Sequence, residues 1–203
     1  MYSRAMMPTL LTSLVLASAL TACKTPPPPP PPVVAPAPYS GPSLPIEQSD
    51  KGVQIFLPST VLFDSGKAEF KLTEATPYLD RVAVLLKTKT SNQVVVEGHT
   101  DNVGSAASNA ALSEQRASTL LKALAARGVP EARLKAIGYS MNRPVASNST
   151  EEGRKLNRRV ELLIVDEKVE NITRGEAPNA FESAWANLKS MIDRGLVKPA
   201  ETK

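Results

Sequence analysis

The chain has 203 residues and a formal net charge of +4, and aromatic side chains make up 4% of it. The positive charge is small and is not gathered with aromatic side chains into a basic face, so the sequence does not support nucleic-acid binding. The single cysteine excludes an internal disulfide, and the single histidine, His99, argues against a metal site. We therefore expect no cofactor and no metal, and a ring at His99 that packs or bonds within its turn.

Residues 1–22 are typical of a secretion signal. Arg4 supplies a positive start, and the apolar run LLTSLVLASAL at 10–20 is too short to span a bilayer comfortably. The run ends in LTAC, which resembles a bacterial lipobox and implies cleavage before Cys23 and lipid attachment to it. By the same resemblance, Lys24 favours the outer membrane over the inner one. An ordinary secretory peptide with a stray cysteine is the alternative.

Residues 23–50 are predicted to form a lipidated cysteine and a proline-rich linker. Eleven of the eighteen prolines lie between Pro26 and Pro45. Proline fixes φ and offers no N–H, so the segment favours an extended polyproline II conformation that spans at most about 80 Å. We expect a spacer between the membrane and a domain; a ligand for a proline-binding domain is the alternative.

Residues 51–168 alternate strand and helix patterns. Apolar side chains alternate with others over 52–57, which predicts a strand. Helical spacing predicts a helix over 72–87, with Thr73 as its cap and Pro77 in its first turn. Three consecutive valines in QVVVEG, at 93–98, predict a strand that is covered on both faces.

A second helix is predicted over 106–127, and Gly128 and Pro130 end it. A strand follows over 133–140, a short helix over 150–156 and a last strand over 158–165. The order βαβαβ(α)β predicts an α+β fold, a two-layer sandwich in which the helices pack on one face of a small mixed sheet.

Residues 169–203 form a tail with an amphipathic helix, predicted over 179–195. Phe181, Trp185, Leu188 and Ile192 fall on one face of that helix, and Trp185 is the only tryptophan of the chain. The apolar face of this helix must pack against another surface. Docking on its own domain and contact with a second copy or a protein partner both remain open.

An acid and a base frame the turn GHTDNVG and the helix that follows it. Asp101 lies in the turn, and Arg116 follows fifteen residues later on the face that also carries Asn109 and, between them, Leu112. An anion and a guanidinium at one rim suit a zwitterion, with Asp101 accepting from the ammonium and Arg116 holding the carboxylate. The alternative is that Asp101 only caps a turn and that Arg116 pairs with Glu114 or solvent.

Three motifs carry a family resemblance: LFDSGKAEF at 62–70, GHTDNVG…N..LSEQRA…L, and GYS…P……EEGRKLNRRVEL. Together they resemble the OmpA-like C-terminal domain family over residues 52–166. The resemblance implies the predicted fold and binding to the free end of diaminopimelate in peptidoglycan stem peptides. It assigns the ammonium to Asp101 and the carboxylate to Arg116. The other positions that it carries over to the pocket are Asn109, Leu112 and Arg158 and, more weakly, Asp64 and Thr100. Val103 departs from the polar residue of some relatives.

We therefore predict a non-enzymatic lipoprotein that tethers the outer membrane to peptidoglycan from the periplasm. Two other classes stay open. An envelope-stress regulator would contact a periplasmic protein through the tail helix. A wall hydrolase would need paired carboxylates, whereas Glu151 and Glu152 are predicted as first-turn helix acids and Glu97 as a solvent-facing strand end.

Overall fold

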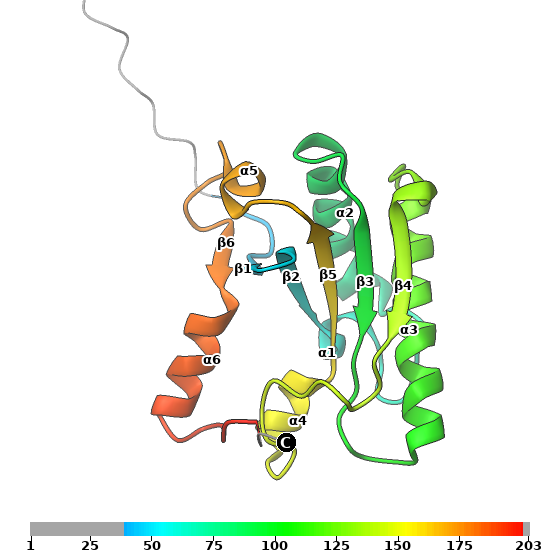
Figure 1. Ribbon diagram of the computed structural model, residues 1–203, viewed down its shortest axis with the longest axis vertical. Coiled ribbons are helices and arrows are strands. Elements are labelled where there is room, and N and C mark those ends of the chain that lie inside the picture. Colours follow the sequence, from blue (N-terminus) through cyan, green and yellow to red (C-terminus); the bar gives the residue numbers. More distant parts are fainter. Residues whose placement is uncertain (1–38, 201–203) are drawn as a thin grey trace, which may run out of the picture. The chain divides into compact units, whose positions relative to one another are not determined.

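The computed structural model describes residues 39–200. The predicted signal sequence, Cys23 and most of the predicted linker lie outside this part of the chain. The described residues form a six-stranded mixed sheet in the order β4-β3-β5-β2-β1-β6 (Figure 1). The strands are β1 (Leu44–Ser49), β2 (Gly52–Pro58), β3 (Val94–Gly98), β4 (Leu134–Gly138), β5 (Arg159–Val165) and β6 (Phe181–Ser183). The helices are α1 (Ser59–Leu62), α2 (Leu72–Thr88), α3 (Ala106–Ala126), α4 (Glu151–Asn157), α5 (Val169–Thr173) and α6 (Ala184–Asp193), with a 3₁₀ turn at Glu131–Arg133.

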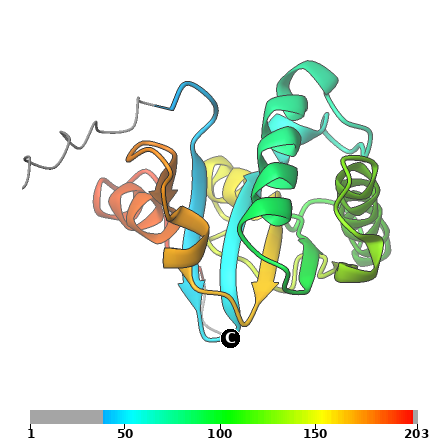
Figure 2. The same ribbon diagram turned by 90° about the horizontal axis from the view of Figure 1, so that it is seen from above.

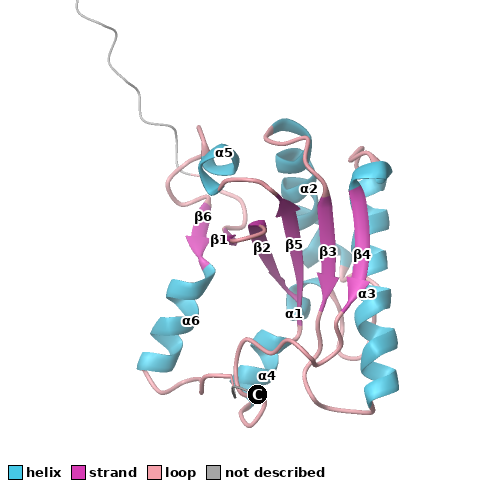
Figure 3. Ribbon diagram, in the orientation of Figure 1, coloured by secondary structure: helices cyan, strands magenta, loops and turns pink. Residues whose placement is uncertain are grey.

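The predicted α+β alternation is confirmed. Strands β3 and β4 run parallel, while β5 pairs antiparallel with both β3 and β2. Helices α2 and α3 cover one face of this sheet, as predicted (Figure 2). The ends of β3 and β4 and the start of the antiparallel strand β5 lie at the same edge of the sheet, where α3 begins (Figure 3).

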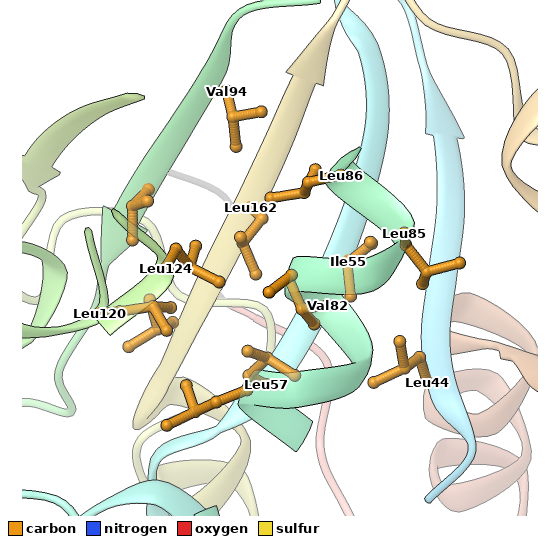
Figure 4. Packing of buried hydrophobic residues seen from close by; sticks show 14 of the residues in the cluster. Leu44, Ile55, Leu57, Val82, Leu85, Leu86, Val94, Leu120, Leu124 and Leu162 are labelled. Atoms are coloured by element: carbon orange, nitrogen blue, oxygen red, sulfur yellow. The ribbon is translucent and has the colours of Figure 1, made fainter. Parts of the chain in front are cut away.

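The core fills the space between the sheet and these two helices. Ile55 and Leu57 of β2 and Leu162 of β5 point toward Val82 of α2 and Leu120 of α3 (Figure 4). All five are fully buried. Burial of a large aliphatic side chain contributes about 1.5–3 kcal/mol, so this layer dominates the stability of the domain.

The tail packs on the other face of the sheet, beside β1 and β2. Phe56 alternates with the core residues of β2 and therefore points away from α2, where its ring meets that of Trp185 at 5.3 Å and 70°. Figure 2 shows α6 beside β1 on the side away from α2. The described structure thus favours docking of the tail helix on its own domain.

Two strands were not predicted. Residues 44–49, assigned to the linker from their prolines, form β1, in which Leu44 and Ile46 are buried. Strand β6 pairs parallel with β1 and replaces the first turn of the predicted tail helix. The helix begins instead at Ala184, where the Ser183 hydroxyl caps it by accepting a hydrogen bond from the Ala186 N–H at 3.1 Å.

The predicted cap of α2 was wrong. The helix begins at Leu72, Lys71 occupies the N-cap position, and its side chain makes no capping bond. Thr73 is therefore already helical and Pro77 lies in the second turn. No helix among residues 39–200 combines the length and the apolar character that crossing a membrane requires.

Candidate functional site

A cavity of about 380 Å³ opens where the loop after β3 meets α3 and α4. In Figure 3 these loops gather at one end of the sheet. Six predicted site residues line the cavity, and Asp64 is the one that does not. The lining residues are Ser65, Gly66, Thr100, Asp101, Val103, Asn109, Leu112, Arg116, Glu151, Arg154 and Arg158.

Asp101 is held by two hydrogen bonds and is 6% exposed. Its Oδ1 accepts from the Val103 N–H at 3.0 Å, which closes the turn, and its Oδ2 accepts from Arg158 Nη1 at 2.5 Å. Asp101 therefore does cap its turn, as the alternative interpretation held, but its second oxygen also belongs to an ion pair inside the cavity. A carboxylate offers about four acceptor sites, so Asp101 can still accept from a cationic group while it keeps both of these bonds.

Arg116 is buried against the loop that connects α1 and α2. Its Nε donates to the Lys67 carbonyl at 2.9 Å and its Nη2 to the Asp64 carbonyl at 3.4 Å. Burial lowers the pKa of the guanidinium, the charge of Arg158 lowers it further, and Asp101 raises it. Among residues 39–200, Nη1 of Arg116 donates no hydrogen bond, so this nitrogen is available to a ligand.

The predicted alternative for Arg116, a pair with Glu114, does not form. The Glu114 carboxylate accepts from the Gly138 N–H at 2.6 Å instead. Asn109 explains how α3 holds the acidic turn, because its Nδ2 donates to the Asp101 and Val103 carbonyls at 3.3 and 3.0 Å. Helix α3 therefore positions both the acid and the base.

The remaining predicted residues differ in their surroundings. Leu112 is half-buried and supplies an apolar wall. Thr100 is buried, and its hydroxyl has no hydrogen-bond partner among the described residues. Asp64 lies in an adjacent hollow of about 200 Å³ that shares Arg116 and Arg158 with the cavity, and its carboxylate pairs with Lys67 at 3.4 Å.

Helix α4 adds two residues that the sequence did not single out for the site. Glu151 accepts from Arg158 at 2.8 Å and from Arg154 at 2.8 Å, and these hydrogen bonds lower the pKa of its carboxyl, Arg158 being the larger cause. Burial alone would lower the pKa of Arg158, but its bonds to Glu151 and Asp101 raise it. The signal was visible, since Glu151, Arg154 and Arg158 are spaced by three and four residues and share one helix face.

With three guanidiniums and two carboxylates, the cavity carries a formal charge of 3 − 2 = +1 before anything binds. The charges are not mixed at random. The free side of Arg116 suits an anion, and the fixed carboxylate of Asp101 suits a cation. The arrangement can therefore accept a small group that carries both an ammonium and a carboxylate.

A second polar cluster surrounds His99 beneath the loop. Glu97, predicted to face solvent, is 6% exposed, so that prediction was wrong; it lies directly across from Glu161 in the neighbouring strand. The His99 ring is buried and stacks on Tyr139 at 5.5 Å, so it packs against the residue that follows β4 and not, as was predicted, within its own turn. Burial raises the pKa of Glu97, and the charge of Glu161 adds to that rise.

The His99 Nε2 lies 3.9 Å from Glu97 and 3.8 Å from Glu161, a spacing that could admit a cation. The carboxylates would favour a charged imidazole, but burial, and after it the charges of Arg159 and Arg143, lower the pKa of His99 to about 2. Since Arg159 Nε donates to Glu161 at 2.6 Å and Arg143 lies 3.7 Å from Glu97, the two acids already have counter-charges. We therefore interpret the cluster as a balanced structural network.

Comparison with known proteins shows which family has sequences similar to the residues that form this site. A model described as the OmpA family matches residues 62–158. Probable lipoprotein YiaD of Escherichia coli is 37% identical over 124 residues, which cover 61% of this chain and 56% of that protein. Peptidoglycan-binding protein ArfA of Mycobacterium tuberculosis is 44% identical over 86 residues, or 42% of this chain and 26% of that protein.

A solved structure, that of the cell wall anchor of the T6SS from Pseudomonas aeruginosa, is 33% identical, with a TM-score of 0.55. The match covers 60% of this chain and 87% of that structure. The chain spans from about a quarter to just over half of the length of the two curated relatives. The residues that match the family contain the whole lining of the cavity, including both of its opposed charges, and the chain belongs to the OmpA family.

Proposed function

We propose that this protein binds peptidoglycan without covalent attachment, through the zwitterionic end of diaminopimelate, and that a lipid on Cys23 anchors it in the outer membrane. The observation that carries the proposal is that Asp101 and Arg116 line one cavity and have different partners. Two relatives support it, because ArfA is a peptidoglycan-binding protein and the T6SS structure is that of a cell wall anchor.

In the proposed complex the ligand ammonium binds the Asp101 carboxylate and shares it with Arg158. The ligand carboxylate binds the open Nη1 of Arg116, whose position is fixed by the backbone carbonyls of Asp64 and Lys67. Because both groups are held before the ligand arrives, little side-chain entropy is lost on binding. Leu112 contacts the methylene groups of the ligand.

Affinity for one stem peptide is expected to be modest, with a Kd of about 10⁻³–10⁻⁶ M, because the ligand is small and the outer charges are screened. The tether compensates for this. A domain held near a dense polymer experiences a high effective concentration, so many weak contacts act together. The predicted linker gives the domain its reach from the membrane.

The test is co-sedimentation of the purified protein with isolated sacculi. Wall of the diaminopimelate type should retain the protein, and wall of the lysine type, which lacks the second carboxylate, should retain markedly less. Asp101→Asn and Arg116→Lys should each weaken retention about tenfold or more. Asp80→Asn and Arg127→Lys alter an acid and a base that pair at 2.7 Å outside the cavity, and both should leave retention unchanged.

The anchor is tested separately, because Cys23 comes from the sequence alone. Cys23→Ser should move the protein from the membrane fraction to the soluble periplasmic fraction and abolish incorporation of a labelled fatty acid. Sacculus binding by the purified variant should not change. An unmodified Cys23 in a membrane-bound protein would remove the anchor from the proposal and leave the wall contact standing.

A further inference from the structure

A second cavity lies on the face of the sheet that α2 and α3 leave free, between α4 and α6. It has a volume of about 260 Å³ and shares no lining residue with the charged cavity. Its apolar walls come from β2, α4 and α6, through Phe56, Leu156, Trp185, Leu188 and Met191. Helix α6 lies outside the residues that match the OmpA family, so the tail of this chain supplies one wall of the cavity and the domain supplies the others.

The cavity is held open by a fixed helix whose apolar face is incompletely covered. The Glu47 carboxylate accepts hydrogen bonds from the Ser183 hydroxyl and the Trp185 N–H, which ties the start of α6 to β1. Phe56 then holds the Trp185 ring edge to face. Yet none of the residues of α6 is buried, and Trp185 remains 41% exposed. An amphipathic helix that is fixed but only partly covered leaves room for an apolar ligand.

The polar groups of the lining restrict what can bind. Arg159 is already committed to Glu161 and to the Arg143 and Asn157 carbonyls. Lys155 is exposed and forms no ion pair with the residues that the structure describes. The cavity therefore offers apolar walls and one ammonium without a carboxylate partner, which suits an apolar chain with an anionic end.

A peptide suits this cavity less well. A bound peptide buries backbone N–H and C=O groups that each need a partner. Besides Lys155 and Arg159, the lining offers only the Asn187 amide and the Trp185 indole N–H as polar side-chain groups, which are too few for a peptide backbone. An alkyl chain requires no such partners. Size agrees as well, because an apolar cavity of about 150 Å³ accepts benzene, and a larger one accepts a longer apolar group.

We propose that this cavity binds a free medium-chain fatty acid, with the alkyl chain between Trp185, Leu188 and Met191 and the carboxylate on Lys155. Trp185 provides the direct measurement, since it is the only tryptophan of the chain and forms part of the wall. Saturated fatty acids of increasing length are titrated into the purified protein, below the concentration at which they aggregate, and tryptophan fluorescence is recorded.

Each added methylene should lower the Kd about fourfold until the chain fills the cavity, after which the Kd should stop falling. Lys155→Gln should raise the Kd of a fatty acid about two- to fivefold and leave that of the matching alcohol unchanged. Lys189→Gln is the matched control, because Lys189 belongs to α6 but lies outside the lining and pairs with Asp193. It should change neither Kd.

Met191→Trp should abolish binding by filling the cavity. Calorimetry checks the loss without relying on fluorescence, and the unfolding midpoint shows whether the variant is folded. In case Met191→Trp does not fold, Leu188→Ala serves as a second variant that should weaken binding of every chain length. A Kd that does not depend on chain length would overturn the proposal. A response to phospholipid vesicles with none to fatty acids would also overturn it and would assign the face to a membrane lipid.

Discussion

Arg158 and Asp101, 57 residues apart in the chain, form an ion pair of 2.5 Å inside the cavity that Arg116 also lines. The pair fixes the carboxylate at one end of the cavity, while Arg116 is fixed at another position by backbone carbonyls. Although α3 holds both the acidic turn and Arg116, the two charged groups themselves are fixed by different partners. A ligand that joins them does not have to order either one, and each charge can be tested without moving the other.

Asp101→Asn should separate the structural role of this residue from its binding role. The amide oxygen can still accept from the Val103 N–H and keep the turn closed. The substitution removes the negative charge, so sacculus binding should fall about tenfold or more. Chemical denaturation should show a stability loss of no more than about 2 kcal/mol. Full retention on sacculi with normal stability would contradict the assignment of the ammonium to Asp101.

Arg116→Lys should lower both the stability and the sacculus binding of the protein although it keeps the positive charge. An ammonium cannot reproduce the guanidinium that bonds the Lys67 and Asp64 carbonyls and lies over the Phe63 ring at 5.3 Å. We expect about 1–3 kcal/mol of destabilisation from the buried groups left without partners, and weaker sacculus binding. Urea unfolding and co-sedimentation measure the two effects. A lysine variant that matches the wild type in both would show that the fork geometry is unimportant.

Gly98→Ala should disturb the site through the backbone. A Cβ at Gly98 would lie 2.1 Å from the Ser113 carbonyl oxygen, so α3 would have to move away from β3. We expect at least about 2 kcal/mol of destabilisation. Gly175→Ala is the control. It has φ of +76° but nothing within 4 Å, so strain alone should cost about 1 kcal/mol. Equal losses in thermal and urea unfolding would refute the close approach.

His99→Phe should make the free energy of unfolding depend less on pH in the acidic range. Burial lowers the folded pKa of His99 to about 2, whereas the unfolded imidazole keeps a value near 6.5. Between these values the unfolded state binds more protons, so stability falls as the pH falls, with a slope of up to about 1.4 kcal/mol per pH unit.

Above its ordinary pKa of 4.5, Glu97 changes the stability with pH in the direction opposite to that of His99, because its folded pKa is raised. Its contribution is therefore present at low pH and is lost as the pH rises through the folded pKa. Urea unfolding at pH 7, 6 and 5 should show that the free energy of unfolding falls less with decreasing pH for His99→Phe than for the wild type. Parallel profiles would mean that the buried imidazole takes up protons in the folded state.

Much of the fold could be predicted because periodicity is local. The alternating residues of β2 and the apolar stripe of α3 follow from the sequence alone. Strands β1 and β6 could not be predicted, because Pro45 interrupts the pattern of β1 and β6 has only three residues. Their pairing depends on contacts between residues 44 and 181, and no local signal reports such a separation.

The candidate site shows the same limit. Asp101 and Arg116 could be chosen because a turn and the helix after it are adjacent in sequence. Glu151 and Arg154 lie about fifty residues from Asp101, and α4 reaches the cavity only after β4 and a long loop. Their spacing on one helix face was visible, but what that face would meet was not. Only the order of the strands in the folded sheet brings α4 beside the loop that follows β3, and no local sequence signal reports that order.

The most direct test of the central claim is a calorimetric titration of the purified protein with a soluble stem peptide that ends in diaminopimelate, beside the same peptide with lysine. The two opposed charges predict a Kd of about 10⁻³–10⁻⁶ M for the first peptide and at least about tenfold weaker binding for the second. Asp101→Asn should weaken binding of both peptides, because both carry the ammonium, and Arg116→Lys should narrow the difference between them. Equal affinity of the wild type for both peptides, unchanged in both variants, would contradict the account.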